Sequence, residues 1–189
     1  MVEDDFRKAR AEDGVSPGIR AQAAAEQLIR NLGAASRTLA LAESCTAGLV
    51  SDFLARIPGA SRVLWGSFVC YTAGAKVSML GLDRERLERY GLVSGETARD
   101  MALAALEKSG SSAAAAVTGL AGPDGDGSGA AVGTVWIAAA LRDKGAAPAK
   151  EFRFRGSRNE VRLQAAAAVL EELLEVCRTA AADGLTGTA

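Results

Sequence analysis

The stretch Thr38-Leu39-Ala40-Leu41-Ala42-Glu43-Ser44-Cys45-Thr46-Ala47-Gly48 joins an apolar run to a segment with helical character. Residues 38–42 predict a buried strand, and residues 46–56 predict a helix. The small hydroxyl side chain of Ser44 falls at the junction, where backbone N–H groups and the positive end of a helix dipole lie close by. This position suits a nucleophile. A serine or threonine that only caps the helix is an equally good interpretation of the local sequence.

The composition narrows the possible functions. The 189-residue chain contains no histidine, so a nucleophilic serine would need a lysine or a carboxylate as its base. Hydrophobic residues make up 49% and charged residues 24%, which is typical of a soluble globular protein. The net charge of −1 and the 5% aromatic content argue against a nucleic-acid-binding or membrane-surface protein.

The three cysteines, Cys45, Cys70 and Cys177, are not clustered. Without histidine they cannot supply the usual zinc ligand sets, so no structural zinc is expected, although a carboxylate magnesium site stays open. Residues 1–18 are charged and lack the apolar core of a signal peptide, and no apolar run is long enough to span a bilayer. Together with the cysteine usage, these features predict a cytoplasmic protein.

Helices and strands are interspersed along the chain. Helices are expected at 19–32, 46–56, 73–80, 84–90, 94–108 and 159–177. Strands are expected at 38–42, 62–71 and 113–118, with a hairpin formed by 132–138 and 149–154. This order predicts an α/β fold, a three-layer α/β/α arrangement with a mixed central sheet in a single domain. The domain is expected at 17–180, between a disordered N-terminal extension at 1–16 and a flexible tail at 181–189.

A second candidate stretch, Tyr71-Thr72-Ala73-Gly74-Ala75-Lys76, follows an expected strand and begins an expected helix. It therefore lies at a sheet edge, where ligand sites of α/β proteins gather. Lys76 can act as a general base if burial lowers its pKa from about 10.4 toward roughly 7–8. The competing interpretations are a solvated helix lysine and, for Tyr71, a strand aromatic packed in the core.

Cys45, next to Ser44, is the competing nucleophile, because a thiol near a helix N-terminus can be activated. The same residue can instead pack inward as a small hydrophobe. Neighbouring side chains at such a turn point in different directions. Only one of the two is therefore expected to face a pocket.

A glycine-rich stretch, 118–129, begins at Thr118-Gly119 and lacks the known phosphate-loop patterns. Its backbone N–H groups can still approach a ligand, although a flexible loop is the competing interpretation. Three arginines, of which Arg158 is the last, precede the final expected helix. An arginine beside free helix N–H donors suits a phosphate, and a solvated basic turn is the alternative.

Six segments occur in the order seen in the CinA C-terminal domain family, which the chain resembles. They are 42–48, which contains Glu43-Ser44-Cys45-Thr46, then 57–61, 66–71, 76–81, 117–123 and 132–136. The resemblance covers roughly residues 19–178, and six ordered motifs are far more specific than any one of them. The family includes nicotinamide-nucleotide amidases, which hydrolyse nicotinamide mononucleotide to nicotinate mononucleotide and ammonia. The chain resembles the stand-alone form of this domain.

The resemblance implies that Ser44 is the nucleophile, Lys76 its general base and Tyr71 part of a hydroxyl network. Ser44 would attack the carboxamide and expel ammonia, giving an acyl-enzyme that water hydrolyses. Backbone N–H groups of the turn would stabilise the oxyanion, a donor being worth about 3–4 kcal/mol. Arg158 would hold the phosphate, and no metal or organic cofactor would be required. The other implied substrate contacts are Cys45, Thr46, Thr118 and Gly119. A homodimer is expected because the family is oligomeric.

The chain departs from the family pattern at two places. Ala47 stands where glycine is common, and the loop 124–131 lacks the basic or proline residue often found before Val-Gly-Thr. Two other functions stay open, and the altered loop motivates the first. One is a catalytically silent nucleotide- or partner-binding module of the same fold, and the other is a hydrolase of another small amide.

Overall fold

The computed structural model describes residues 14–127 and 129–186. Its centre is a six-stranded sheet with the order β2-β1-β3-β4-β5, in which β6 also pairs with β4. The strands are β1 (Leu39–Glu43), β2 (Leu64–Val69), β3 (Ala113–Gly119), β4 (Thr134–Leu141), β5 (Gly145–Ala146) and β6 (Lys150–Arg153). β1 runs parallel to β2 and β3, whereas β4 runs antiparallel to β3, β5 and β6. The predicted mixed sheet is confirmed.

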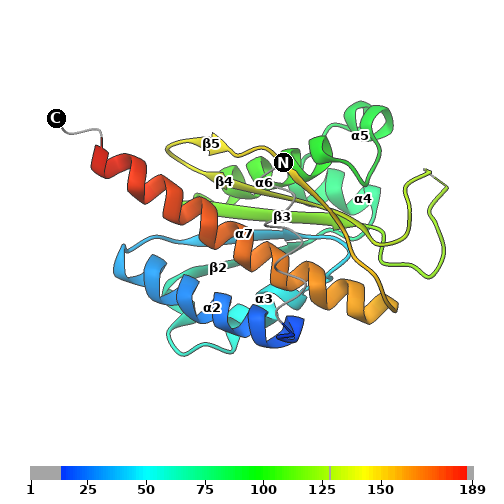
Figure 1. Cartoon of the computed structure of the whole chain (residues 1–189). Helices are drawn as coiled ribbons and strands as arrows, with labels where there is room; N and C mark the ends of the chain where they lie inside the picture. Colours follow the sequence, from blue (N-terminus) through cyan, green and yellow to red (C-terminus); the bar gives the residue numbers. More distant parts are fainter. Residues whose placement is uncertain (1–13, 128, 187–189) are drawn as a thin grey trace.

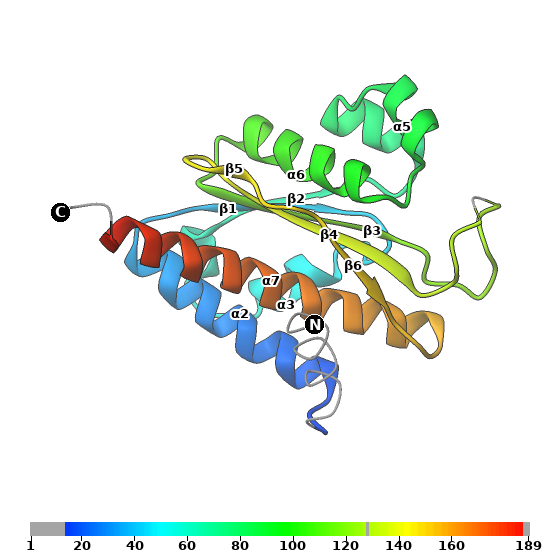
Figure 2. The ribbon, with the colours of Figure 1, turned by 45° about the horizontal axis from the view of Figure 1, so that its top comes forward.

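Helices cover both faces of this sheet (Figures 1 and 2). One face carries α2 (Pro17–Ala34), α3 (Leu49–Ala55) and α7 (Arg158–Thr186). The other carries α4 (Ala73–Ala75), the π-helix η2 (Lys76–Leu80), α5 (Arg84–Tyr90) and α6 (Gly95–Ser109). A short 3₁₀ helix, η1 (Ala60–Arg62), leads into β2. The three-layer α/β/α prediction is therefore confirmed.

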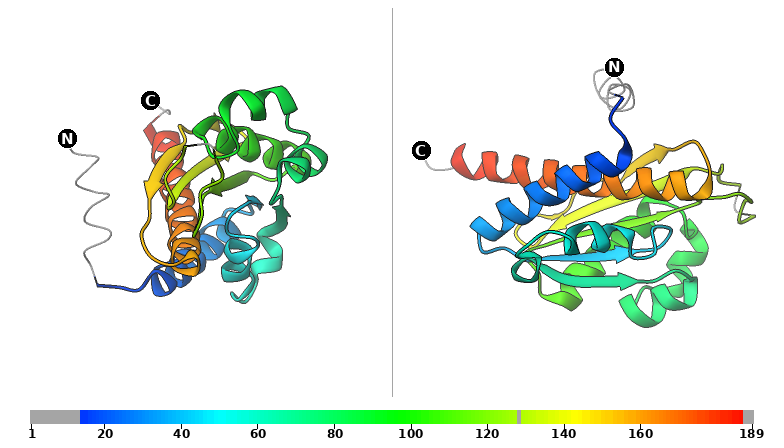
Figure 3. Two further views of the ribbon diagram at one scale, coloured as in Figure 1. Left: turned by 90° about the vertical axis from the view of Figure 1, so that its right-hand side faces the viewer. Right: turned by 90° about the horizontal axis from the view of Figure 1, so that it is seen from below.

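The two faces of β1 explain why it reads as an unbroken apolar run. Leu39 and Leu41 pack into the core under α2, α3 and α7, while Ala40 and Ala42 face the core under α6. Side chains alternate across a strand, so a strand covered on both sides buries every residue. The alanines on the α6 side let that helix lie close to the sheet. On the other face, α2 and α7 lie side by side (Figure 3).

Several element boundaries differ from the sequence-based prediction. The helix expected from residue 46 begins only at Leu49, because Ala47 and Gly48 have positive φ angles of 50° and 92° that no right-handed helix accommodates. The helix expected at 73–80 is one α-helical turn followed by the π-helix. The hairpin is present, but its return strand is split into β5 and β6.

The last helix is longer than the sequence predicts. α7 continues to Thr186, past both the predicted helix end at 177 and the predicted domain boundary at 180. Residues 1–13 and 187–189, which hold most of the predicted extension and the end of the predicted tail, lie outside the described residues. Within the described ranges, no helix combines the length and the apolar character needed to cross a membrane.

Candidate active site

The site lies at the carboxyl ends of three parallel strands. Ser44 follows β1, Tyr71 follows β2, and Thr118 lies near the end of β3. The connection from β1 to β2 passes over one face of the sheet through α3, and the connection from β2 to β3 passes over the other through α6 (Figure 2). β1 is therefore the strand at which the chain direction across the sheet changes. In open α/β sheets, ligands bind outside the carboxyl ends at such a point.

The side chains of Ser44 and Lys76 meet at this edge. Lys76 Nζ donates to Ser44 Oγ at 2.8 Å and to the carbonyl oxygen of Cys70 at 3.0 Å. Lys76 is only 1% exposed and Ser44 only 7%, so the lysine is not a solvated helix residue. Burial lowers the pKa of Lys76, because an ammonium loses its hydration there. A buried amine in contact with a hydroxyl has the geometry of a general base.

Lys76 lies at the start of the π-helix η2. Thr72 caps the preceding turn by accepting from the N–H of Ala75 at 3.1 Å, and Lys76 opens the wider π-helical segment. Lys76 and Leu80 face inward, while Met79 between them is 41% exposed. Such segments are uncommon and occur frequently at functional sites. Sequence periodicity predicted an ordinary helix here, since it does not distinguish the two windings.

A buried carboxylate, Glu43, shapes the turn that carries Ser44. Glu43 is 1% exposed and accepts five hydrogen bonds. The donors are Thr46 Oγ1 at 2.8 Å, Gly48 N at 2.9 Å, and Val50 N, Ser51 N and Ser67 Oγ at 3.0 Å each. The carboxylate satisfies free N–H groups at the start of α3 and complements the helix dipole.

The role of Glu43 excludes the capping interpretation of Ser44. No side chain caps α3 at its N-cap residue, Gly48, and the hydroxyl of Thr46 is bonded to Glu43. The sequence pattern did not predict this role of Glu43. The available signal was an acidic residue between a buried strand and a helix start.

Cys45 points away from the Lys76 side of the turn. Its side chain is 5% exposed and lies in the core beneath α3 and α7. Burial raises the pKa of the Cys45 thiol to about 11, so the thiolate is disfavoured at neutral pH. Cys45 therefore follows the inward-packing interpretation, and Ser44 is the nucleophile candidate.

Thr46, Thr118 and Gly119 lie at the carboxyl ends of β1 and β3, and the hydroxyls of both threonines are already hydrogen-bonded within the protein. Thr46 is fully buried on Glu43, and Thr118 Oγ1 donates to Leu92 O at 2.7 Å. A Cβ on Gly119 would lie 2.7 Å from Val135 Cγ2 and 2.8 Å from Thr134 O, so only glycine fits beside β4. Any contact of Thr46 or Gly119 with a ligand would therefore use the backbone.

Tyr71 and Arg158 meet at the outer rim of the site. Arg158, the first residue of α7, donates to the Tyr71 hydroxyl and to Gly122 O. Tyr71 is 49% exposed, so it is not a packed core aromatic. The structure thus places Tyr71 with the phosphate candidate Arg158. Its described hydrogen bond goes to neither Ser44 nor Lys76.

Arg162 reaches the site although no sequence pattern indicated it. The residue lies one turn after Arg158 on α7, and its guanidinium donates to the carbonyl oxygens of Cys45 at 3.2 Å and Thr46 at 2.9 Å. The pairing joins residues 117 positions apart, so only the tertiary fold brings them together.

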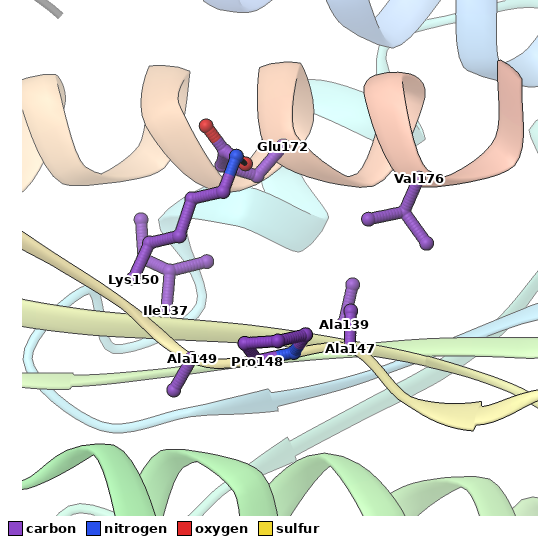
Figure 4. A pocket seen from close by; sticks show the side chains of 8 residues that line it. All are labelled: Ile137, Ala139, Ala147, Pro148, Ala149, Lys150, Glu172 and Val176. Carbon is purple, nitrogen blue, oxygen red and sulfur yellow. Dashed lines mark ion pairs between the residues drawn. The ribbon is translucent and has the colours of Figure 1, made fainter. Parts of the chain in front are cut away.

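A cavity of about 280 Å³ lies elsewhere, between α7 and the strands β4 to β6 (Figure 4). Lys150 and Glu172 form an ion pair of 2.6 Å at its wall, and the rest of the lining is mostly apolar. None of the candidate site residues lines it. Among the side chains that the structure describes, in 14–127 and 129–180, no cluster of three or more Cys, Asp or Glu could hold a metal ion.

The fold and this site define an α/β protein with a buried Ser–Lys pair at the switch point of a mixed sheet. The model of the CinA C-terminal domain matches residues 21–177. The chain belongs to this family.

Relatives of two kinds match the chain. The "Nicotinamide-nucleotide amidohydrolase PncC" of Enterobacter agglomerans is 42% identical over 133 residues, which cover 70% of this chain and 80% of that protein. A "CinA-like protein" of Syntrophomonas wolfei is also 42% identical, over 137 residues that cover 72% of this chain and 32% of that protein. The chain spans about a third of the length of several curated relatives of this second kind.

Solved structures of the superfamily share the fold. The competence/damage inducible protein CihA from Agrobacterium tumefaciens has a TM-score of 0.79 at 37% identity, covering 82% of this chain and 94% of that one. A CinA superfamily protein from Escherichia coli has a TM-score of 0.79 at 30% identity, covering 82% of this chain and 90% of that one.

Proposed function

We propose that this protein is an amidohydrolase that deamidates nicotinamide mononucleotide to nicotinate mononucleotide and ammonia. The observation that carries the proposal is the buried contact between Lys76 Nζ and Ser44 Oγ, in which burial lowers the pKa of the amine. The relative named nicotinamide-nucleotide amidohydrolase, at 42% identity, supports the choice of substrate.

In the proposed first step, neutral Lys76 takes the proton of the Ser44 hydroxyl while Oγ attacks the carboxamide carbon. The lysine lone pair accepts along the 2.8 Å contact, and an N–H of the amine still donates to Cys70 O. The carbonyl π bond opens to an oxyanion. Collapse of this tetrahedral intermediate breaks the C–N bond, and Lys76 returns its proton to the departing nitrogen, which leaves as ammonia.

In the second step, water replaces the leaving group. Lys76 takes a proton from the water as its oxygen attacks the acyl carbon, and the Oγ–C bond breaks. The proton returns to Ser44, and the nicotinate product leaves. One water molecule is consumed and one ammonia molecule released per turnover, which balances the reaction.

Arg158 and Tyr71 are proposed to hold the phosphate end of the substrate. Both are exposed at the rim, and Arg158 stands at the N-terminus of α7, where helix N–H groups favour an anion. A guanidinium and a phenolic hydroxyl are both hydrogen-bond donors to phosphate. Their present contact with each other holds the pair together before substrate arrives.

The direct test is ammonia release from nicotinamide mononucleotide by the wild-type protein, Ser44→Ala and Lys76→Ala. We expect turnover by the wild-type protein and a loss of at least about 10⁴-fold in both variants, as for a nucleophile and its base. Circular dichroism and thermal unfolding check that both variants are folded. Normal turnover by either folded variant would contradict the Ser–Lys mechanism.

The same assay separates the two alternative functions. A rise in melting temperature with the nucleotide, without ammonia release, would favour a silent binding module. Ammonia release from amides that lack the ribose phosphate, but not from the nucleotide, would favour a different amidase.

A cytoplasmic location and a homodimeric state stay predictions. Sedimentation equilibrium measures the oligomeric state.

A further inference from the structure

Arg162 is charged and contacts the turn between β1 and α3 that carries Ser44. It has no part in the two proposed reaction steps. Its Nε donates to Cys45 O at 3.2 Å, its Nη2 to Thr46 O at 2.9 Å and its Nη1 to Asn159 Oδ1 at 3.1 Å. Two consecutive carbonyl oxygens directly after Ser44 are therefore held by one planar guanidinium. A planar fork fixes direction as well as distance.

The Cys45–Thr46 peptide is trans, since the single cis bond of the described chain is at Gly122-Pro123. In a trans peptide the carbonyl oxygen and the following N–H point in opposite directions within one plane. By holding Cys45 O, Arg162 sets the direction of the Thr46 N–H, which points away from the guanidinium. Arg162, on α7, thus fixes the orientation of the Cys45–Thr46 peptide plane.

The Thr46 N–H, like that of Cys45, has no hydrogen-bond acceptor in the part of the chain that the structure describes. The N–H of Ser44 donates to Val117 O, and that of Ala47 donates to Ser44 O, both at 3.0 Å. A backbone donor left free two residues after a nucleophile is available to a developing oxyanion.

The charge of Arg162 also acts on this peptide. A cation at the carbonyl oxygen polarises the peptide, which strengthens the opposite N–H as a donor. Burial raises the pKa of Cys45 to about 11, and Arg162 is among the charges that oppose this rise. Its field therefore reaches the residue beside Ser44.

We propose that Arg162 is a positioning residue that orients and polarises the Cys45–Thr46 peptide, so that the Thr46 N–H stabilises the oxyanion formed on attack by Ser44. The inference rests on the proposed function. Glu43 holds the same turn from the α3 side through Thr46 Oγ1 and Gly48 N–H. Glu43, at the end of β1, and Arg162, on α7, together fix the turn.

The test compares Arg162→Gln and Arg162→Lys with Arg178→Gln, a control that removes an arginine from the same helix. Arg178 pairs with Glu175 on the surface, with 71% of its side chain exposed. We expect kcat for ammonia release to fall about 10- to 100-fold in Arg162→Gln while KM stays within about threefold, because only the transition state carries the oxyanion. Arg162→Lys keeps the charge but not the fork, so an intermediate loss is expected.

A second readout does not depend on the nucleotide. The burst of 4-nitrophenolate from 4-nitrophenyl acetate reports acetylation of Ser44, in which the Oγ–C bond forms, the aryl ester bond breaks and Lys76 takes the proton. The Arg162→Gln burst rate is expected to fall by a factor similar to that in kcat. For Arg162→Ala, millimolar guanidinium ion should restore part of the burst rate, and it should restore none in Ser44→Ala.

The outcomes separate this inference from the proposed function. Burst rates within twofold of wild type in Arg162→Gln, or a lower melting temperature with unchanged kcat, would reduce Arg162 to a structural contact and overturn the inference. If the wild-type protein acetylates Ser44 but releases no ammonia from nicotinamide mononucleotide, this nucleotide is not the substrate. The burst rates then still decide the role of Arg162. If wild type shows neither reaction, both proposals are wrong.

Discussion

At the scale of single residues, the site depends on a buried lysine, Lys76, whose ammonium form would be stabilised by water. Lys76 is 1% exposed, and it forms no ion pair with any residue of the described chain. Its partners are one hydroxyl and one carbonyl oxygen, from Ser44 and Cys70. Neither partner carries a charge that would favour the ammonium, so desolvation is the dominant effect on its pKa.

The pH dependence of activity follows from this burial. Because neutral Lys76 is the proposed base, kcat/KM should rise with pH through an apparent pKa below the ordinary value of 10.5. Initial rates of ammonia release across pH 6–10 measure the profile. A flat profile, or one that falls through this range, would contradict a lysine base.

The lowered pKa of Lys76 also makes the stability of the folded protein depend on pH, in a defined direction. Since the pKa of Lys76 is lower when folded than when unfolded, the unfolded chain binds more protons between the two values. Below the pKa of Lys76 in the folded state, burying the ammonium has its full free-energy cost. This cost decreases as the pH rises from that pKa toward the pKa of Lys76 in the unfolded chain. Relative to Lys76→Met, the wild-type protein should therefore gain stability as the pH rises.

At the scale of elements, the turn between β1 and α3 is held by an acceptor rather than by a capping hydroxyl. Glu43 supplies two oxygens to five donors, of which three are backbone N–H groups at the start of α3. An acceptor at this end of a helix interacts favourably with its dipole. The strained left-handed φ of Ala47, 50°, is tolerated because the flanking residues are fixed in this way.

Glu43→Gln should destabilise the fold without changing the shape of the side chain. One carboxylate oxygen becomes an NH₂ group that faces donors, so a buried N–H such as that of Val50 loses its acceptor. We expect the free energy of unfolding to fall by about 1–3 kcal/mol. Urea denaturation measures the change, with the exposed Glu88→Gln as the control expected to stay within about 0.5 kcal/mol. An unchanged midpoint would show that the carboxylate does not hold the turn.

At the scale of the whole molecule, the sheet separates two cores. The core beneath α2, α3 and α7 contains the larger aliphatic side chains, among them Leu28, Leu170 and Leu173, each fully buried. The core beneath α6 is rich in alanine. The catalytic candidates lie at one edge of the sheet, so packing deep in the larger core affects stability more than chemistry.

Leu173→Ala tests this separation. Removing a fully buried leucine side chain should cost about 2–5 kcal/mol, since it loses burial and leaves a cavity. Thermal unfolding measures the loss, with Ile19→Ala on α2, 63% exposed, as the matched control. The folded variant should keep a kcat near that of wild type. A large fall in kcat at a temperature where the variant is fully folded would contradict the separation.

Much of the fold was predictable because its signals are local. Apolar runs such as 38–42 and 113–118 gave strands, the glycines and prolines gave turns, and the interspersed order gave a mixed sheet between helices. The boundaries at Leu49, Lys76 and Thr186 were not predictable in the same way. A left-handed turn, a π-helical winding and the length of a last helix depend on tertiary contacts that periodicity does not record.

By itself the sequence determined the α/β class, the absence of imidazole chemistry and the candidacy of Ser44 and Lys76, because each follows from composition or from patterns within a few residues. Only the tertiary structure decided that Lys76 is buried against Ser44, and that Cys45 turns into the core. It also decided that Glu43 and Arg162 both hold the turn through hydrogen bonds with Thr46. The physical reason is that pKa values and oxyanion geometry depend on burial and on hydrogen bonds between residues far apart in the chain, which exist only once the sheet brings its strand ends together.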